Sequence, residues 1–114
     1  MAPNPTPSAR LVLSTAGSRD EAEKIARTVV ERRLAGCVNL IPNLTSVYSW
    51  QGAIETAHEV LMVIKTSGER LPELEAALRE MHSYEVPEFV VIALESGNQA
   101  YLDWLFAAVA PSSP

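Results

Sequence analysis

The sequence of 114 residues contains a single cysteine, so no disulfide can form within the chain. One cysteine fits a reducing compartment, and we expect a cytoplasmic protein. Apolar runs such as those at residues 60–64 and 89–94 are far shorter than the roughly 20 residues that a membrane-spanning helix needs. The first nine residues also lack the apolar segment of a secretory signal. We therefore expect a protein that has no membrane partner.

Positive charge and aromatic residues are also scarce. Nine Lys and Arg residues stand against 14 Asp and Glu, and the only basic doublet, Arg32-Arg33, lies within an acidic helical pattern. Proteins that bind phosphate backbones cluster their basic residues on one surface. The expected central strands, residues 11–14 and 60–65, have no aromatic side chain on which a base could stack. We therefore expect no nucleic-acid partner.

Catalytic motifs are absent as well. The five glycines are scattered singly, so the chain has neither a phosphate-binding loop nor a dinucleotide fingerprint. Glu55 and Glu59 share a strand face, but at about 3.3 Å per residue they lie roughly 13 Å apart, too far to act as a pair. No nucleophile and base can be paired either. Catalysis therefore ranks last among the function classes, and we expect a protein that is not an enzyme.

The two ends of the chain differ from its middle. Three of the first nine residues are proline, and residues 111–114 read Pro-Ser-Ser-Pro. Neither segment has apolar periodicity, so residues 1–9 and 111–114 are predicted to be disordered tails. Residues 10–110 are long enough for one domain with a single core.

The first half of the domain predicts a strand, a helix and a long hairpin. Residues 11–13 form a short buried strand, and Ser18 with Glu21 makes a capping box that opens a helix. Gly36 fits the stop of that helix. Two apolar-rich strands then run from Cys37 to Thr66 about a turn at Gln51-Gly52, and Pro42 predicts a bulge or a sheet edge. Each strand is about twice the usual length of roughly 5–6 residues, so we expect the hairpin to project and to be covered by another subunit.

The second half predicts a helix, a strand and a last helix. Pro72 lies in the first turn of the second helix, which ends near Met81-His82, and residues 84–88 are expected to be extended before Pro87 and a strand at 89–94. Gly97-Asn98 precedes the last helix. This order of elements predicts an α+β, ferredoxin-like βαββαβ subunit with an antiparallel sheet and an extra C-terminal helix. Right-handed crossovers place the first two helices on one face, and the other, apolar face requires cover from another subunit.

Three side chains are candidates for binding chemistry. His58 lies within an apolar strand face, where a structural histidine is the more frequent case. Cys37 at a strand start is more often a small core residue than a ligand. His82, at a helix C-terminus, gains from the helix dipole whether or not it binds anything.

Five segments resemble the CutA family of divalent-cation tolerance proteins: AGCVNLIP (35–42), TSVYSWQG (45–52), residues 59–66, HSYEVPE (82–88) and YLDW (101–104). The similarity covers about residues 10–108. It implies a homotrimer of ferredoxin-like subunits joined by strand pairing through the long hairpin. It also implies a function in tolerance of copper and other divalent metals.

The resemblance also implies a metal site. The positions of the family's proposed ligands hold Ser14, Met81 and His82 here. We expect a trimer that pools His82, Cys37 or Met81 to bind copper or another divalent cation weakly, with loss of binding on removal of His82. No cofactor is expected to be obligatory for folding.

A second hypothesis is a trimer similar to the PII-type signalling proteins, which binds a small molecule or a protein in clefts between subunits. Six residues are candidates to line such clefts: Tyr48, Trp50, Lys65, Tyr84, Glu85 and Trp104. The alternative for these side chains is packing at a subunit interface, where Trp and Tyr are enriched.

Overall fold

The computed structural model describes residues 8–111 of the chain. The elements, in order, are β1 (Ala9–Ala16), α1 (Arg19–Glu31), β2 (Cys37–Trp50), β3 (Ala53–Ser67), a 3-10 turn (Gly68–Arg70), α2 (Leu71–Met81), β4 (Val90–Ala93) and α3 (Gln99–Val109). The predicted tails lie outside the described residues except at their inner ends. There the structure corrects one boundary, because Ala9 is the first residue of β1 and is buried.

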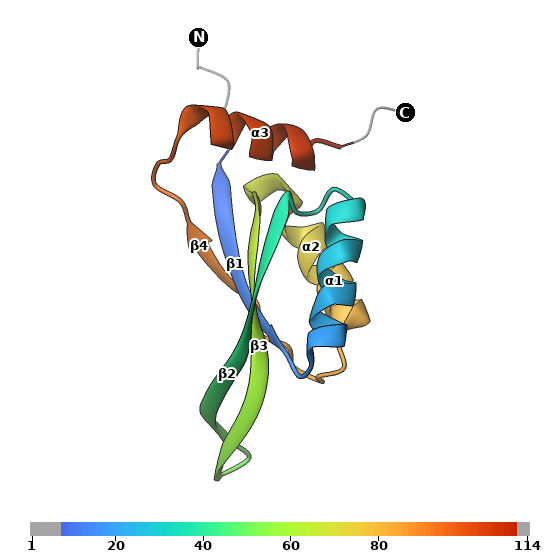
Figure 1. Ribbon diagram of the computed structural model, residues 1–114, viewed down its shortest axis with the longest axis vertical. Coiled ribbons are helices and arrows are strands. Elements are labelled where there is room, and N and C mark those ends of the chain that lie inside the picture. Colours follow the sequence, from blue (N-terminus) through green and yellow to red (C-terminus); the bar gives the residue numbers. More distant parts are fainter. Residues whose placement is uncertain (1–7, 112–114) are drawn as a thin grey trace.

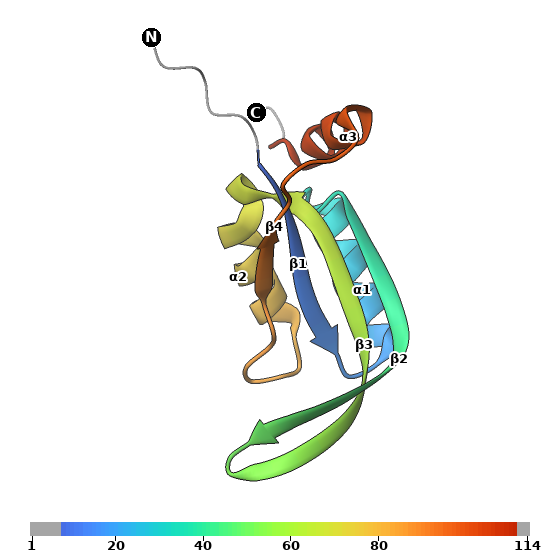
Figure 2. The ribbon, with the colours of Figure 1, turned by 90° about the vertical axis from the view of Figure 1, so that its left-hand side faces the viewer.

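The four strands form one antiparallel sheet in the order β2-β3-β1-β4. Helices α1 and α2 cover one face of this sheet, and α3 lies across one end of it (Figures 1 and 2). We call the face opposite α1 and α2 the open face. This arrangement confirms the ferredoxin-like α+β prediction.

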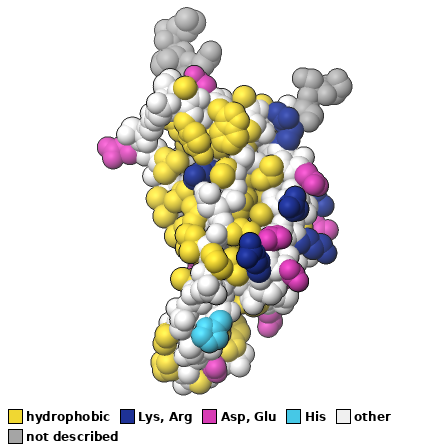
Figure 3. All heavy atoms as spheres, in the orientation of Figure 1, with side chains coloured by type: hydrophobic (Ala, Val, Ile, Leu, Met, Phe, Trp, Pro, Cys, Tyr) yellow, Lys and Arg dark blue, Asp and Glu magenta, His cyan; other side chains and the backbone are white. Residues whose placement is uncertain are grey.

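The core lies between the sheet and its two covering helices. Side chains that are fully buried there come from every layer: Val12, Ile25, Met62, Ile64, Leu74 and Leu78. On the other side of β3, Leu61 and Val63 point to the open face and are only half-buried. Figure 3 shows apolar side chains gathered over the sheet, whereas charged side chains gather over α1.

Helix α1 begins as the sequence predicts. Ser18 is the N-cap, and its Oγ accepts a hydrogen bond of 3.2 Å from the backbone N–H of Glu21. The Glu21 carboxylate accepts from the backbone N–H of Gly17 at 3.4 Å. The carboxylate therefore bonds to the residue before the N-cap. Its second oxygen is left to accept a hydrogen bond from another segment.

The predicted end of α1 is wrong. The helix ends at Glu31, and Arg33, with φ of 60°, takes the left-handed position that was assigned to Gly36. The N–H groups of Arg33 and Leu34 then bond to the carbonyls of Val30 and Val29, at 3.0 and 2.9 Å, which is a Schellman motif. Gly36 has a different reason to be glycine, since a Cβ there would lie 2.7 Å from Cδ1 of Leu105 in α3.

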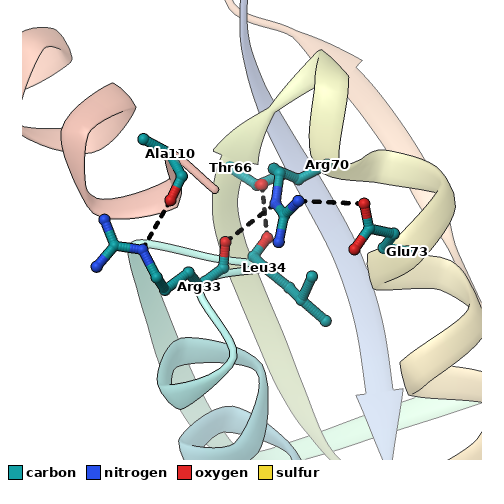
Figure 4. A network of polar contacts seen from close by, with 6 residues as sticks. All are labelled: Arg33, Leu34, Thr66, Arg70, Glu73 and Ala110. Carbon is teal, nitrogen blue, oxygen red and sulfur yellow. Dashed lines mark hydrogen bonds and ion pairs between the residues drawn. The ribbon is translucent and has the colours of Figure 1, made fainter. Parts of the chain in front are cut away.

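Tertiary contacts hold Arg33 in this conformation (Figure 4). Its guanidinium donates to the carbonyls of Ala110 and Ala107 at 2.7 and 2.8 Å, so it caps the C-terminus of α3. Its own carbonyl accepts from Arg70 at 3.2 Å. A glycine could not make the two guanidinium bonds, so these bonds offset the cost of the left-handed backbone at Arg33.

The hairpin of β2 and β3 dominates the shape of the chain, which measures 55 × 27 × 23 Å. Trp50 pairs with Ala53 across a two-residue turn in which Gln51 and Gly52 have φ of 50° and 83°, as in a type I′ turn. The register shifts between Ile41 and Leu44, which confirms the bulge predicted at Pro42. Strand β2 is also an edge of the sheet.

Candidate functional site

A groove of about 590 Å³ lies between the end of the hairpin and the segment that joins α2 to β4. Figure 2 shows the hairpin curving beneath this segment. The segment, residues 82–89, bends at residues 83–86, so the prediction of an extended chain over 84–88 is wrong for its first half. The residues that line the groove are Thr15, Ser46, Val47, Tyr48, Trp50, Glu59, Tyr84, Glu85, Val86 and Glu88.

The bulge in β2 decides which side chains enter the groove. Ile41 pairs with Leu61, and Leu44 pairs with Glu59. A step of three residues along β2 therefore spans a step of only two residues along β3. Because side chains alternate along a strand, the extra residue moves the even-numbered positions of β2 to the open face. Tyr48 and Trp50 thereby come to the same face as Glu59.

Glu59 and Tyr84 form the floor of the groove. The Tyr84 hydroxyl donates a hydrogen bond of 2.8 Å to Oε2 of Glu59, and only 9% of Glu59 is exposed. Burial raises the pKa of Glu59, but hydrogen bonds from Ser46, Tyr84 and Thr15 outweigh it and lower the pKa below the ordinary value. Burial and the bond to Glu59 raise the pKa of Tyr84. Glu59 is therefore a fixed negative charge and Tyr84 a fixed donor.

His82 anchors the segment that carries Tyr84. It is the C-cap of α2 and is buried; its Nε2 lies 2.7 Å from the carbonyl oxygen of Thr15, and its Nδ1 accepts from the backbone N–H of Tyr84 at 3.0 Å. Since Nδ1 accepts, Nε2 carries the proton and donates to Thr15. The second oxygen of Glu21 accepts from Ser83 at 2.8 Å, so α1 holds the segment as well. His82 and Glu21 thus position Tyr84 over the end of β1.

The charge of the groove has one sign. Glu59, Glu85 and Glu88 are among its lining residues, and no Lys or Arg is among them in the part of the chain that the structure describes. Burial, and next the negative charge of Glu59, raise the pKa of Glu88. The groove therefore presents carboxylates to any ligand that enters.

The structure separates the candidate metal ligands. His82 contacts Thr15, which pairs with Leu61, whereas Cys37 pairs with Lys65, four residues further along β3. At about 3.3 Å per residue, roughly 13 Å of strand lies between them. Met81 packs against the hydrophobic core.

These residues do not fit a metal site in the described part of the chain. Both ring nitrogens of His82 are bonded to the backbone, and Oγ of Ser14 donates to the Glu88 carbonyl at 2.6 Å. No three His, Cys, Asp or Glu side chains within residues 8–111 converge closely enough to hold a metal ion. His58 shares a face of β3 with Val60, as predicted, but it lies on the hairpin opposite Thr45 and is exposed in the single chain.

The six candidates for cleft lining fall into two groups. Tyr48, Trp50, Tyr84 and Glu85 line the groove together. Lys65 and Trp104 lie outside it, around Tyr101: Nζ of Lys65 is 5.7 Å above the centre of the Tyr101 ring, and the Tyr101 and Trp104 rings are 5.4 Å apart.

Sequence reasoning missed two residues of the site. Glu21 was interpreted only as a helix cap, and Glu59 only as half of a carboxylate pair that was too widely spaced. A signal for Glu59 did exist, because a charged residue directly before the buried run at 60–64 needs a partner once it is buried.

Fold and site together define the class of this protein, a small ferredoxin-like domain with a projecting hairpin and an acidic, aromatic groove. No helix in the described residues is long and apolar enough to cross a membrane. The chain belongs to the CutA1 divalent ion tolerance protein family, whose model matches residues 10–108.

Individual relatives agree with this assignment. The divalent-cation tolerance protein CutA of Thermus thermophilus is 44% identical over 95 residues, which cover 83% of this chain and 92% of that protein. Human protein CutA is 52% identical over 84 residues, which cover 74% of this chain but only 47% of the human protein. The crystal structure of CutA1 from Oryza sativa has a TM-score of 0.89 at 32% identity and covers 92% of this chain and 96% of that one.

Proposed function

We propose that this protein is a homotrimer that contributes to divalent-cation tolerance by binding a ligand in its groove, not by catalysing a reaction. The observation that supports assembly most strongly is the projecting hairpin. Strand β1 pairs with β3 only from Ser67 back to Val60, so residues 53–59 of β3 have no partner on that side within the described chain. On the same part of the hairpin, Val47 and Ile54 are 67% and 76% exposed.

A second apolar edge is strand β4, which lies on the same side of β3 as the unpaired edge of residues 53–59. Strand β4 is four residues long, and Val90, Val91 and Ile92 are all exposed in the single subunit. Unpaired strand edges with apolar side chains favour pairing with another chain. Two such edges on one subunit support a closed assembly in which each subunit contacts two others.

Light scattering on the purified protein is expected to give three times the 12.4 kDa mass of one chain at micromolar concentration. Val63→Asp, on the half-buried open face, is expected to reduce this mass, because the face that we propose as subunit contact would then bury a charge. A wild-type mass near that of one chain would refute the trimer. A fully trimeric Val63→Asp would show that another face is the contact.

Metal binding is proposed to be weak and of no importance for folding. Copper binding by His82 would require its imidazole to give up one of two backbone hydrogen bonds. In contrast, the imidazole of His58 is exposed. Structural metal sites generally need three or four converging ligands.

Titration calorimetry with Cu(II) is expected to give a Kd of about 1 µM or weaker. Chelator is expected to leave both the mass and the melting temperature unchanged. We expect His58→Ala to reduce the binding of Cu(II) more than His82→Ala, because only the first imidazole is free to coordinate. Nanomolar binding that is lost on His82→Ala would contradict this prediction.

The groove specifically favours the second candidate function, a binding module similar in architecture to the PII-type proteins. Four of the six predicted lining residues face one concave site, and such sites are where small ligands bind. We also propose a cytoplasmic location, which the single cysteine supports.

A further inference from the structure

Helix α3 is held to the rest of the fold by little apolar contact. Its buried side chains are Leu105 and Val109, and neither belongs to the core between the sheet and helices α1 and α2. A cavity of about 210 Å³ lies beside its last turn, between Phe106 and Val109 of α3 and Ser67 and Glu69 at the end of β3. Segments with few buried apolar contacts open at a lower free energy than the core does. Packing therefore holds α3 less firmly than α1 or α2, whose buried side chains lie in the core.

The hydrogen bonds that hold α3 in place come from one side chain. The guanidinium of Arg33 donates to the carbonyls of Ala110 (Figure 4) and Ala107, at the negative end of the helix dipole. Within residues 8–111, no other hydrogen bond joins α3 or its C-cap to the rest of the fold. The ammonium of Lys65, 5.7 Å above the Tyr101 ring, adds a single cation–π contact. Arg33 therefore makes the directional contacts that keep the C-terminal end of α3 docked.

The backbone that carries Arg33 is fixed independently of α3. The Arg33 carbonyl accepts from the Arg70 guanidinium at 3.2 Å, and the next carbonyl, that of Leu34, accepts from the buried hydroxyl of Thr66 at 2.7 Å (Figure 4). The Leu34 side chain is part of the core. The two bonds to α3 therefore begin at a point that stays in place when α3 moves.

We propose that α3 is a strap that detaches from the end of the sheet while the rest of the domain stays folded, and that Arg33 is its latch. Opening breaks the two guanidinium bonds and uncovers Leu105, Val109 and one wall of the cavity beside them. The core between the sheet, α1 and α2 stays intact. Neither a ligand in the groove nor a subunit contact is needed for this motion, which is therefore separate from the proposed function.

The test is backbone hydrogen exchange of the intact chain at low concentrations of denaturant, with light scattering of the same samples to give the oligomeric state. We expect the amides of α3 to exchange faster than the slowest amides of β1 and β3, each of which has a paired strand on both sides. The exchange of α3 is also expected to depend less on denaturant, because a local opening exposes less surface than unfolding of the whole domain. Equal rates and equal denaturant dependence would overturn the proposal.

Matched variants separate the latch from the core. Arg33→Ala keeps the Cβ atom but loses both bonds, so the exchange of α3 is expected to become about tenfold faster. Arg32→Ala removes the same charge at the exposed neighbouring position and is expected to change this rate less than about twofold. Ile25→Val weakens the core, which stays folded when the strap opens. It is therefore expected to speed exchange of the slowest sheet amides severalfold and to leave the exchange of α3 unchanged.

The left-handed backbone of Arg33 provides one more variant. Arg33→Gly loses the same two bonds but adopts φ of 60° without steric cost, so α3 is expected to exchange as fast as in Arg33→Ala. Slower exchange of α3 than in the wild type, or equal rates in Arg33→Ala and Arg32→Ala, would refute the latch. Equal acceleration of α3 and the sheet by Ile25→Val would show that α3 opens only with the whole domain. A trimer without separate opening of α3 would refute the strap alone, and a monomer with it would refute the assembly alone.

Discussion

The variant Met62→Asp is expected not to fold. Met62 is fully buried at the centre of the sheet, where it pairs with Ser14 on one side and Leu40 on the other. An aspartate at this site has no partner charge in the surrounding core. Burial of an unpaired carboxylate costs several kcal/mol, a large part of the roughly 5–15 kcal/mol that stabilises a domain.

Circular dichroism and the yield of soluble protein measure this effect. Ala76→Asp, at an exposed position of α2, is the control and is expected to cost at most about 1 kcal/mol in the free energy of unfolding. A folded, cooperative Met62→Asp variant would show that the sheet face beneath α1 and α2 is not the core.

The variant His82→Ala is expected to lower the free energy of unfolding by about 2–4 kcal/mol. The change removes both hydrogen bonds of the imidazole and leaves the carbonyl of Thr15 and the N–H of Tyr84 without these partners. It also removes the ring that packs 4.6 Å from the ring of Tyr84. The groove is therefore expected to lose its shape together with stability.

The chain contains its own control, because His58 is the only other histidine. His58→Ala, at a position exposed in the single chain, is expected to cost less in the free energy of unfolding than His82→Ala, and light scattering separates any effect on assembly. Denaturant unfolding of both variants gives the comparison. Equal effects of the two changes would mean that the contacts of His82 contribute nothing measurable.

Much of the fold could be predicted because the signals are local. The N-cap at Ser18, the turn at Gln51-Gly52 and the bulge near Pro42 each depend on residues close in sequence, and all three were confirmed, although Glu21 accepts from Gly17 and not from Ser18 as a capping box requires. The end of α1 could not be predicted in the same way. Its left-handed residue, Arg33, is held by carbonyl groups of α3 that lie more than 70 positions away in the chain.

The candidate site could be predicted only in part from the sequence. Tyr48, Trp50, Tyr84 and Glu85 are predicted to line a cleft between subunits; in the single chain they line one groove, and the cleft between subunits stays a prediction. Trp104 and Lys65 were grouped with them because aromatic and charged residues look alike in a sequence wherever they fold. The role of Glu59 depends on the Tyr84 hydroxyl, 25 residues away, and no periodicity could reveal that contact.

The amino-acid sequence by itself determined the order of the elements, the helix faces and the over-long hairpin, because periodicity, caps and turns act over a few residues. Only the tertiary structure decided what the functional candidates do. In it, both ring nitrogens of His82 are bonded to the backbone, and Cys37 lies far from His82 along β3. Carboxylates and aromatic rings lie together at the groove. The physical reason is that hydrogen bonding, burial and electrostatic coupling at a site depend on distances between segments, which local sequence patterns do not contain.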